Sequence, residues 1–158
     1  MDRSTRLLAL AREIASANPT FHEVRGPGAG DHATREFMKE LRRRALEAFG
    51  GDYSERRICG ATSFAVDFYF PEERTVVEVA LGLPNSASEF EKDILKAIIA
   101  QDYGNDVDRL FFISRPGAEK KCSQPGRRAV LEWARTKHRL VIEVHELEGE
   151  PRRRRGRK

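Results

Sequence analysis

The stretch SFAVDFYFPEERTVVEVALG, residues 63–82, decides the fold. Two runs rich in Phe and Val flank Pro-Glu-Glu-Arg, which is typical of two β-strands joined by a tight turn. Each run carries one carboxylate among its apolar residues, Asp67 in the first and Glu78 in the second. The stretch therefore predicts a hairpin with one acidic residue on each strand.

The register of this hairpin determines whether the two acids meet. If Phe70 pairs with Thr75 across an even-length turn, Asp67 lies opposite Glu78 with Cβ atoms about 5 Å apart. Two opposed negative charges on a half-buried sheet are destabilising unless a cation lies between them. Two carboxylates beside a strand suit Mg²⁺, with water completing the octahedron. Two alternatives stay open: an odd-length turn would make the pair diagonal, and on an edge strand either acid could face solvent.

The rest of the chain predicts helices and strands on both sides of the hairpin. Apolar residues at helical spacing indicate a first helix that ends near Asn18 and a second that begins at Asp31 or Thr34. A weak strand at 55–59 precedes the hairpin; a helix over about 86–103, a strand at 108–114, a helix from about 125 and a strand at 139–147 follow it. This order predicts an α/β fold with a mixed central sheet flanked by helices. Residues 1–150 are long enough for one domain.

The hairpin resembles the PD-(D/E)XK nuclease superfamily, which includes restriction endonucleases, Holliday junction resolvases and repair nucleases. The motif of that superfamily is an Asp near the end of one strand, followed by Glu-X-Lys on the next strand. Asp67 matches the Asp and Glu78 matches the Glu. The expected αβββαβ core, residues 33–114, is similar as well, and a further αβ unit follows it. The resemblance implies a restriction endonuclease-like fold.

The third position of the motif departs from the family, because it is Ala80 where a Lys is expected. Some family members supply this lysine from the helix that follows the strand. Here that helix offers Lys92 and Lys96, and we predict Lys92 first and Lys96 second. An ordinary surface position for both lysines is the alternative, since they are spaced i to i+4.

The resemblance implies a Mg²⁺-dependent endonuclease of restriction or repair type, in which Mn²⁺ can substitute for Mg²⁺. Asp67, Glu78 and the Val79 carbonyl would bind the metal, and Asp67, Glu78 and Lys92 would be the catalytic residues. The expected partner is nucleic acid, double-stranded DNA first, and a homodimer would supply one site for each strand. Ala80 favours an alternative, a catalytically decayed module of the same fold that binds nucleic acid or a protein. An unrelated α/β binding protein is a third possibility.

Basic residues gather in two places. The last seven residues, RRRRGRK, hold six of the 29 basic residues and none of the 25 acidic ones, so the rest of the chain is slightly acidic. We expect residues 151–158 to be a disordered tail that attracts polyanions. The second place is the segment 114–128, after a predicted strand, where sheets of this kind commonly carry binding loops. Its predicted DNA contacts are Arg115, Lys120, Lys121, Arg127 and Arg128.

The two cysteines and the hydropathy pattern bear on location. Cys59 and Cys122 lie far apart and form no CxxC pair, which indicates reduced thiols and predicts a cytoplasmic protein. No apolar run approaches the roughly 20 residues of a membrane helix. The four histidines show no spacing typical of zinc ligands.

Overall fold

A five-stranded mixed sheet forms the centre of the protein in a computed structural model that describes residues 1–22 and 29–148. The strands β1 (Ser54–Arg56), β2 (Val66–Phe70), β3 (Thr75–Val79), β4 (Arg109–Ser114) and β5 (Val141–Glu146) lie side by side in chain order. The first two pairings are antiparallel, and the β3–β4 and β4–β5 pairings are parallel. A meander followed by two crossovers gives the α/β class and the mixed sheet expected from the sequence.

The hairpin has the predicted register. Phe70 pairs with Thr75, and Phe68 pairs with Val77. A short 3-10 helix, Pro71–Glu73, makes the turn, and Arg74 closes it in the left-handed conformation with φ of 53°. Extending this register by one residue places Asp67 across from Glu78. The expectation of an even-length turn is confirmed.

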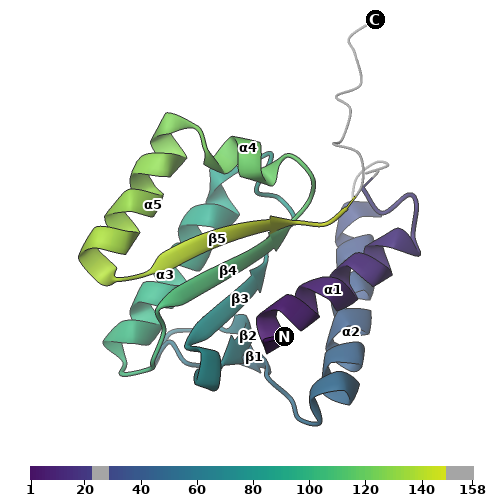
Figure 1. Ribbon diagram of the computed structural model, residues 1–158, viewed down its shortest axis with the longest axis horizontal. Coiled ribbons are helices and arrows are strands. Elements are labelled where there is room, and N and C mark those ends of the chain that lie inside the picture. The colour runs from purple at the N-terminus through teal and green to yellow at the C-terminus, as the bar shows by residue number, and fades with distance from the viewer. Residues whose placement is uncertain (23–28, 149–158) are drawn as a thin grey trace, which may run out of the picture.

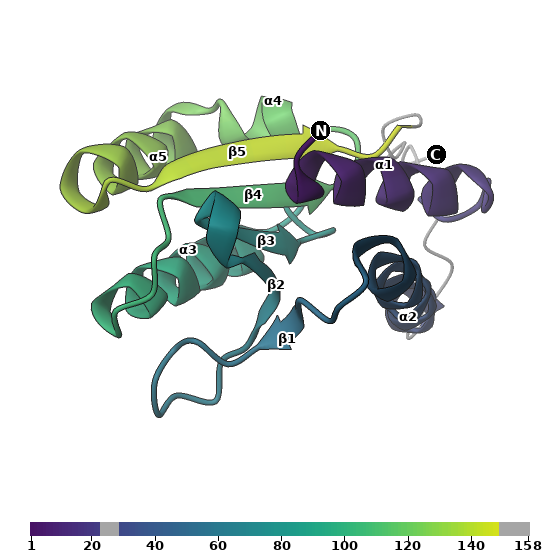
Figure 2. The same ribbon diagram turned by 60° about the horizontal axis from the view of Figure 1, so that its bottom comes forward.

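Helices cover both faces of the sheet, as Figures 1 and 2 show. On one face, α1 (Arg3–Ser16) and α2 (Ala29–Phe49) pack on apolar side chains of the strands such as Phe68, Val77 and Phe111. On the other face, α3 (Ala87–Asp102) and α5 (Pro125–His138) pack on Tyr69, Val76 and Phe112, with the short helix α4 (Ala118–Cys122) nearby. Alternate residues of β3 and β4 therefore contribute to two separate cores.

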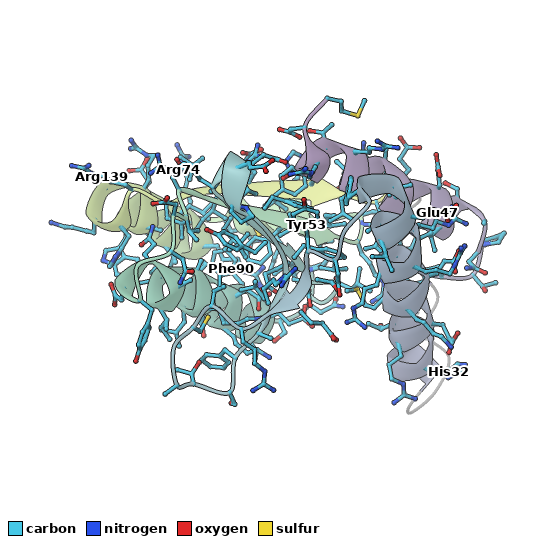
Figure 3. All side chains as sticks on the ribbon, turned by 90° about the horizontal axis from the view of Figure 1, so that it is seen from below. His32, Glu47, Tyr53, Arg74, Phe90 and Arg139 are labelled. Atoms are coloured by element: carbon cyan, nitrogen blue, oxygen red, sulfur yellow. The ribbon has the colours of Figure 1, made fainter. Side chains whose placement is uncertain are left out.

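Helix α3 carries a buried stripe that holds it against the sheet. Ser86 caps its N-terminus by accepting the N–H of Ser88. Phe90 is 1% exposed and its ring lies 6.1 Å from that of Phe112 on β4. Figure 3 shows Phe90 in the packed interior, whereas Arg74 and Arg139 lie at the periphery. The contact between Phe90 and Phe112 fixes which side of α3 faces the sheet.

One sequence expectation requires adjustment, and another cannot be compared with the structure. The weak strand expected at 55–59 is only three residues long and ends at Arg56, so Cys59 belongs to the connection between β1 and β2. The predicted basic tail, 151–158, lies outside the described residues. Within the described part of the chain, no helix is both long and apolar enough to cross a membrane.

Candidate active site

The two hairpin acids lie on the face of the sheet that α3 covers. Val76 and Ala80, the neighbours of Glu78 at two-residue spacing, belong to the core beneath α3, as does Tyr69 beside Asp67. Asp67 Oδ2 accepts the backbone N–H of Val79 at 2.8 Å. Because Val79 directly follows Glu78, this bond anchors the Asp67 carboxylate next to the Glu78 position.

Glu78 is a buried carboxylate whose negative charge faces a lysine. Glu78 is 2% exposed, and its Oε1 lies 2.9 Å from Lys96 Nζ on α3. That oxygen is buried and accepts no hydrogen bond of good geometry from any residue in the described ranges. A buried carboxylate oxygen normally has such a partner. Glu78 is therefore held by the ion pair with Lys96 through this oxygen, and no hydrogen bond from another described residue supports it.

Asp93 adds a third carboxylate to the cluster. It lies one turn before Lys96 on α3, and its Oδ1 is 3.4 Å from Lys96 Nζ. Both residues are 5% exposed, because they share the face of α3 that also carries Phe90 and Ala97. Asp67, Glu78, Asp93 and Lys96 form what we call the acid–lysine cluster, with three acids around one ammonium group.

The pKa values of the cluster reflect this excess of acids. Burial raises the pKa of Glu78 well above its ordinary value, and the charges of Asp67 and Asp93 raise it further. Burial also raises the pKa of Asp93, to about 6. Burial lowers the pKa of Lys96, but the surrounding carboxylates outweigh that effect and hold it above the ordinary value. The arrangement lacks positive charge, which a divalent cation would supply.

The structure places Lys96, rather than Lys92, in the cluster. Lys92 is exposed on α3, whereas the ammonium group of Lys96 contacts Glu78 directly. The alternative of an ordinary surface position for both lysines is wrong for Lys96, which is 5% exposed. Asp93 shares a helical face with Phe90, Ile94 and Ala97, and Lys96 lies next to that face, but this spacing alone does not identify either residue as a neighbour of Glu78.

Ala80, at the position where the motif has lysine, lies in a place without room for one. Its residue is 1% exposed. Its N–H donates to Ile113 O at 2.9 Å, and its carbonyl accepts the Ser114 hydroxyl at 2.6 Å. A lysine here would have to displace its neighbours in the core beneath α3. The positive group beside Glu78 comes from the helix instead.

Cys59 connects the β1–β2 segment to this part of α3. Its Sγ lies 3.3 Å from the backbone carbonyl of Lys96, and burial raises the pKa of its thiol. The contact fixes the backbone of Lys96 from outside the helix. Sequence patterns gave no indication of it, because the pairing spans 37 residues.

The donor set fits a magnesium ion held mainly by water. Among the described residues, no three His, Cys, Asp or Glu side chains form a ready-made metal cage. Mg²⁺ does not need one, since it commonly binds through one or two carboxylates and keeps several waters. Asp67 and Glu78 supply two carboxylates, and the contact of Glu78 Oε1 that a metal would replace is the ion pair with Lys96. Val79 donates its N–H to Asp67 and pairs with Ile113 of β4, and its carbonyl as a metal ligand stays a prediction.

The predicted DNA contacts fall into two groups. Arg115 and Arg127 are each 9% exposed. Arg115 lies over the Phe21 ring at 5.1 Å, and Arg127 lies over Phe90 at 5.2 Å and donates to the carbonyl of Leu83.

These two guanidinium groups hold loops to the core, a role that their position in a basic segment did not reveal. Lys120 and Arg128 are exposed and Lys121 is half-buried, so these three keep side chains near solvent.

Comparison with models of protein families, with curated proteins and with solved structures finds no match for this chain.

Proposed function

We propose that this protein is a Mg²⁺-dependent endonuclease, of restriction or repair type, that hydrolyses phosphodiester bonds in double-stranded DNA. The observation that carries the proposal is the acid–lysine cluster. Asp67 and Glu78 come from adjacent strands in the predicted register, and Lys96 reaches Glu78 from the following helix at 2.9 Å. Two acids and a lysine in this order are what the resemblance to PD-(D/E)XK nucleases implies, with the lysine moved to α3.

The fold supports the same proposal. A β1–β2–β3 meander followed by α3 and a parallel β4 is the αβββαβ order that the resemblance implies. Glu78 lies near the carboxyl end of β3, and β4 is parallel to it. The segment after β4 therefore starts at the same edge of the sheet, and Lys120, Lys121 and Arg128 follow in it. We assign these three, with the basic tail, to contacts with DNA phosphates.

Each residue of the cluster has a role in the proposed reaction. Asp67 and Glu78 would hold the metal, which when bound would supply Lewis-acid polarisation of a phosphate oxygen and a lowered pKa of water. Lys96 would orient the attacking water or stabilise the negative charge that develops on the phosphate. The water oxygen forms a bond to phosphorus and releases a proton to solvent, the phosphorus–oxygen ester bond breaks, and the departing sugar oxygen takes up a proton from solvent.

Plasmid cleavage tests the proposal. The protein is incubated with plasmid and with single-stranded DNA, with and without Mg²⁺ or Mn²⁺. We expect metal-dependent cleavage that is lost in Asp67→Ala, with DNA binding kept because fewer negative charges face the phosphates. Lys96→Met should lose cleavage on the order of a hundredfold, while Lys92→Met should keep it. A parent rate in Asp67→Ala would overturn the assignment, and loss in Lys92→Met alone would return the role to Lys92.

A catalytically decayed module with the same fold is the second candidate. It is favoured by Ala80 and by the direct Lys96–Glu78 ion pair, which partly neutralises the site without any metal. Metal titration separates the two candidates. A nuclease site should show Mg²⁺- or Mn²⁺-dependent thermal stabilisation that disappears in Glu78→Gln, whereas a decayed module should show none.

Assembly and compartment complete the proposal. We assign a homodimer on duplex DNA, because one copy supplies one cluster and a duplex has two strands. Sedimentation of the protein with and without a short duplex measures the assembly. Cys59 and Cys122 are both buried and unpaired, which supports action in the reducing cytoplasm.

A further inference from the structure

Asp93 is the one buried acid of the acid–lysine cluster to which the proposed reaction gives no role. It is 5% exposed, and it forms an ion pair with Lys96, with 3.4 Å between Oδ1 and Nζ. Buried carboxylates are costly unless they are paired, and an exposed i to i+3 pair would contribute little. The burial of both partners sets this pair apart from ordinary helix-surface ion pairs.

A metal ion at Glu78 would compete with Lys96. The ammonium group lies 2.9 Å from Glu78 Oε1, the oxygen that carries no hydrogen bond. Two cations on one oxygen repel each other strongly at low dielectric. When a divalent cation binds Glu78, the ammonium group needs another anion close by, or it leaves the site where the reaction requires it.

The backbone at Lys96 is held in place, so a change in the position of its ammonium group would come from its side chain. Cys59 holds the Lys96 carbonyl, and α3 is capped at Ser86. Glu89, one turn before Asp93, accepts the N–H of Gly82 at 2.9 Å and is occupied there. The Asp93 carboxylate, already 3.4 Å from the ammonium nitrogen, is the next anion available to it.

We propose that Asp93 is a positioning residue that receives the ammonium group of Lys96 when a divalent cation takes Glu78. The inference rests on the proposed function and deepens it. In the metal-free protein, Lys96 shares Glu78 and Asp93. In the metal-bound protein, Asp93 alone keeps the ammonium group beside the phosphate, so metal binding and lysine placement are coupled through this carboxylate.

Metal titration of the full chain without DNA tests the coupling. The readout is the Mn²⁺ concentration that gives half-maximal thermal stabilisation. We expect Asp93→Asn to raise this concentration on the order of tenfold, since Lys96 then has only Glu78, and Lys96→Met to lower it by a similar factor. Asp102→Asn, an exposed acid of the same helix, is the matched control and should leave it unchanged.

The double variant decides between a positioning role and a general effect of charge. In the Lys96→Met background, Asp93→Asn should change the midpoint less than twofold, because the lysine it serves is gone. A full tenfold effect in that background would overturn the proposal. If Lys96→Met does not fold, Asp93→Glu decides instead: a midpoint near that of the parent supports the proposal, and one as high as in Asp93→Asn refutes it.

Cleavage kinetics give the second readout. Asp93→Asn should lower kcat on the order of a hundredfold with KM for DNA within threefold, because DNA contacts lie elsewhere. An unchanged kcat would refute the proposal. Failure of the proposed function looks different: a parent protein that shows no metal-dependent stabilisation removes the metal site itself. A parent protein that binds metal but does not cut DNA leaves the coupling to be decided by the titration.

Discussion

Two clusters of charged residues, on opposite faces of the sheet, use similar side chains to different effect. On the α1 face, Arg109 contacts Asp2, Glu73 and Glu143 at 3.4–3.5 Å. On the α3 face, Lys96 contacts Glu78 and Asp93. Each cluster places several acids around one base, but the surroundings of the acids differ.

The difference lies in hydrogen bonding and burial. Glu73 accepts the N–H groups of Arg3 and Ser4 and the Ser4 hydroxyl, and Asp2 accepts the N–H of Thr5, whose hydrogen bonds lower the pKa of Asp2. Glu78 Oε1 accepts none from the described residues, and burial raises its pKa. An acid-rich cluster that is saturated with donors stabilises the fold, whereas one left short of donors is a candidate ligand site.

The largest expected effect separates the clusters by activity. Glu78→Gln should lower metal-dependent DNA cleavage by about a thousandfold or more, because a neutral amide is a poor metal ligand. The matched change Glu73→Gln should leave the cleavage rate within about twofold. Cleavage assays on both folded variants measure the contrast, and equal losses would show that the two clusters do not differ in function.

Stability should respond in the opposite sense. Glu73→Gln should destabilise the protein by about 2 kcal/mol, because backbone donors of α1 lose a charged acceptor. Asp93→Asn should stabilise the metal-free protein by about 1 kcal/mol at pH 7. The raised pKa of Asp93 means that its ionised form is unfavourable in the folded state, and the neutral amide avoids that cost. Urea denaturation gives both numbers. Destabilisation by both changes would mean that the α3 cluster is structural as well.

The pH dependence of stability sharpens the comparison. Folding raises the pKa of Asp93 from 3.8 to about 6, so the native state binds more protons than the unfolded state in that range. The stability of the metal-free protein should therefore fall as pH rises from about 4 to 6. Glu78, whose pKa is raised further, extends this loss of stability to higher pH. Asp2, whose pKa is lowered, contributes stability that is lost as pH falls below about 4. Denaturation at stepped pH should show a smaller fall in Asp93→Asn, and an unchanged profile would contradict the assignment to Asp93.

The smallest expected effect concerns the support of Lys96. Cys59→Ala removes the thiol contact to the Lys96 carbonyl and should lower the cleavage rate about threefold, in keeping with one weak hydrogen bond. Cys122→Ala is the control, since that thiol lies beside Arg127 instead. Equal rates in the two variants would remove Cys59 from the account of the site.

The sequence was informative where the two-residue alternation of side chains along a strand and a tight turn determine the geometry. Alternation along β2 and β3, with an even-length turn, was enough to place Asp67 opposite Glu78. The choice between Lys92 and Lys96 could not be made that way. The two lysines differ by one turn along α3, and which turn lies over Glu78 depends on where the helix crosses the sheet. Asp93 was missed for the same reason, because an acid on an apolar stripe is recognised only once its partner is known.

Arg115 and Arg127 show a second limit. Composition marks a basic segment, but it does not tell which guanidinium groups turn inward to lie on Phe21 and Phe90. That direction is set by aromatic rings distant in the chain, which only the folded arrangement brings close.

The hydrogen bond from Val79 N–H to Asp67 has a practical consequence for anyone who needs an inert version of this protein. The carboxylate serves as a backbone acceptor as well as a proposed ligand, so alanine at position 67 removes both at once. Asparagine retains an oxygen that can accept the Val79 N–H while giving up the negative charge. The asparagine variant is therefore the one expected to trap the protein on uncut DNA with its hairpin intact.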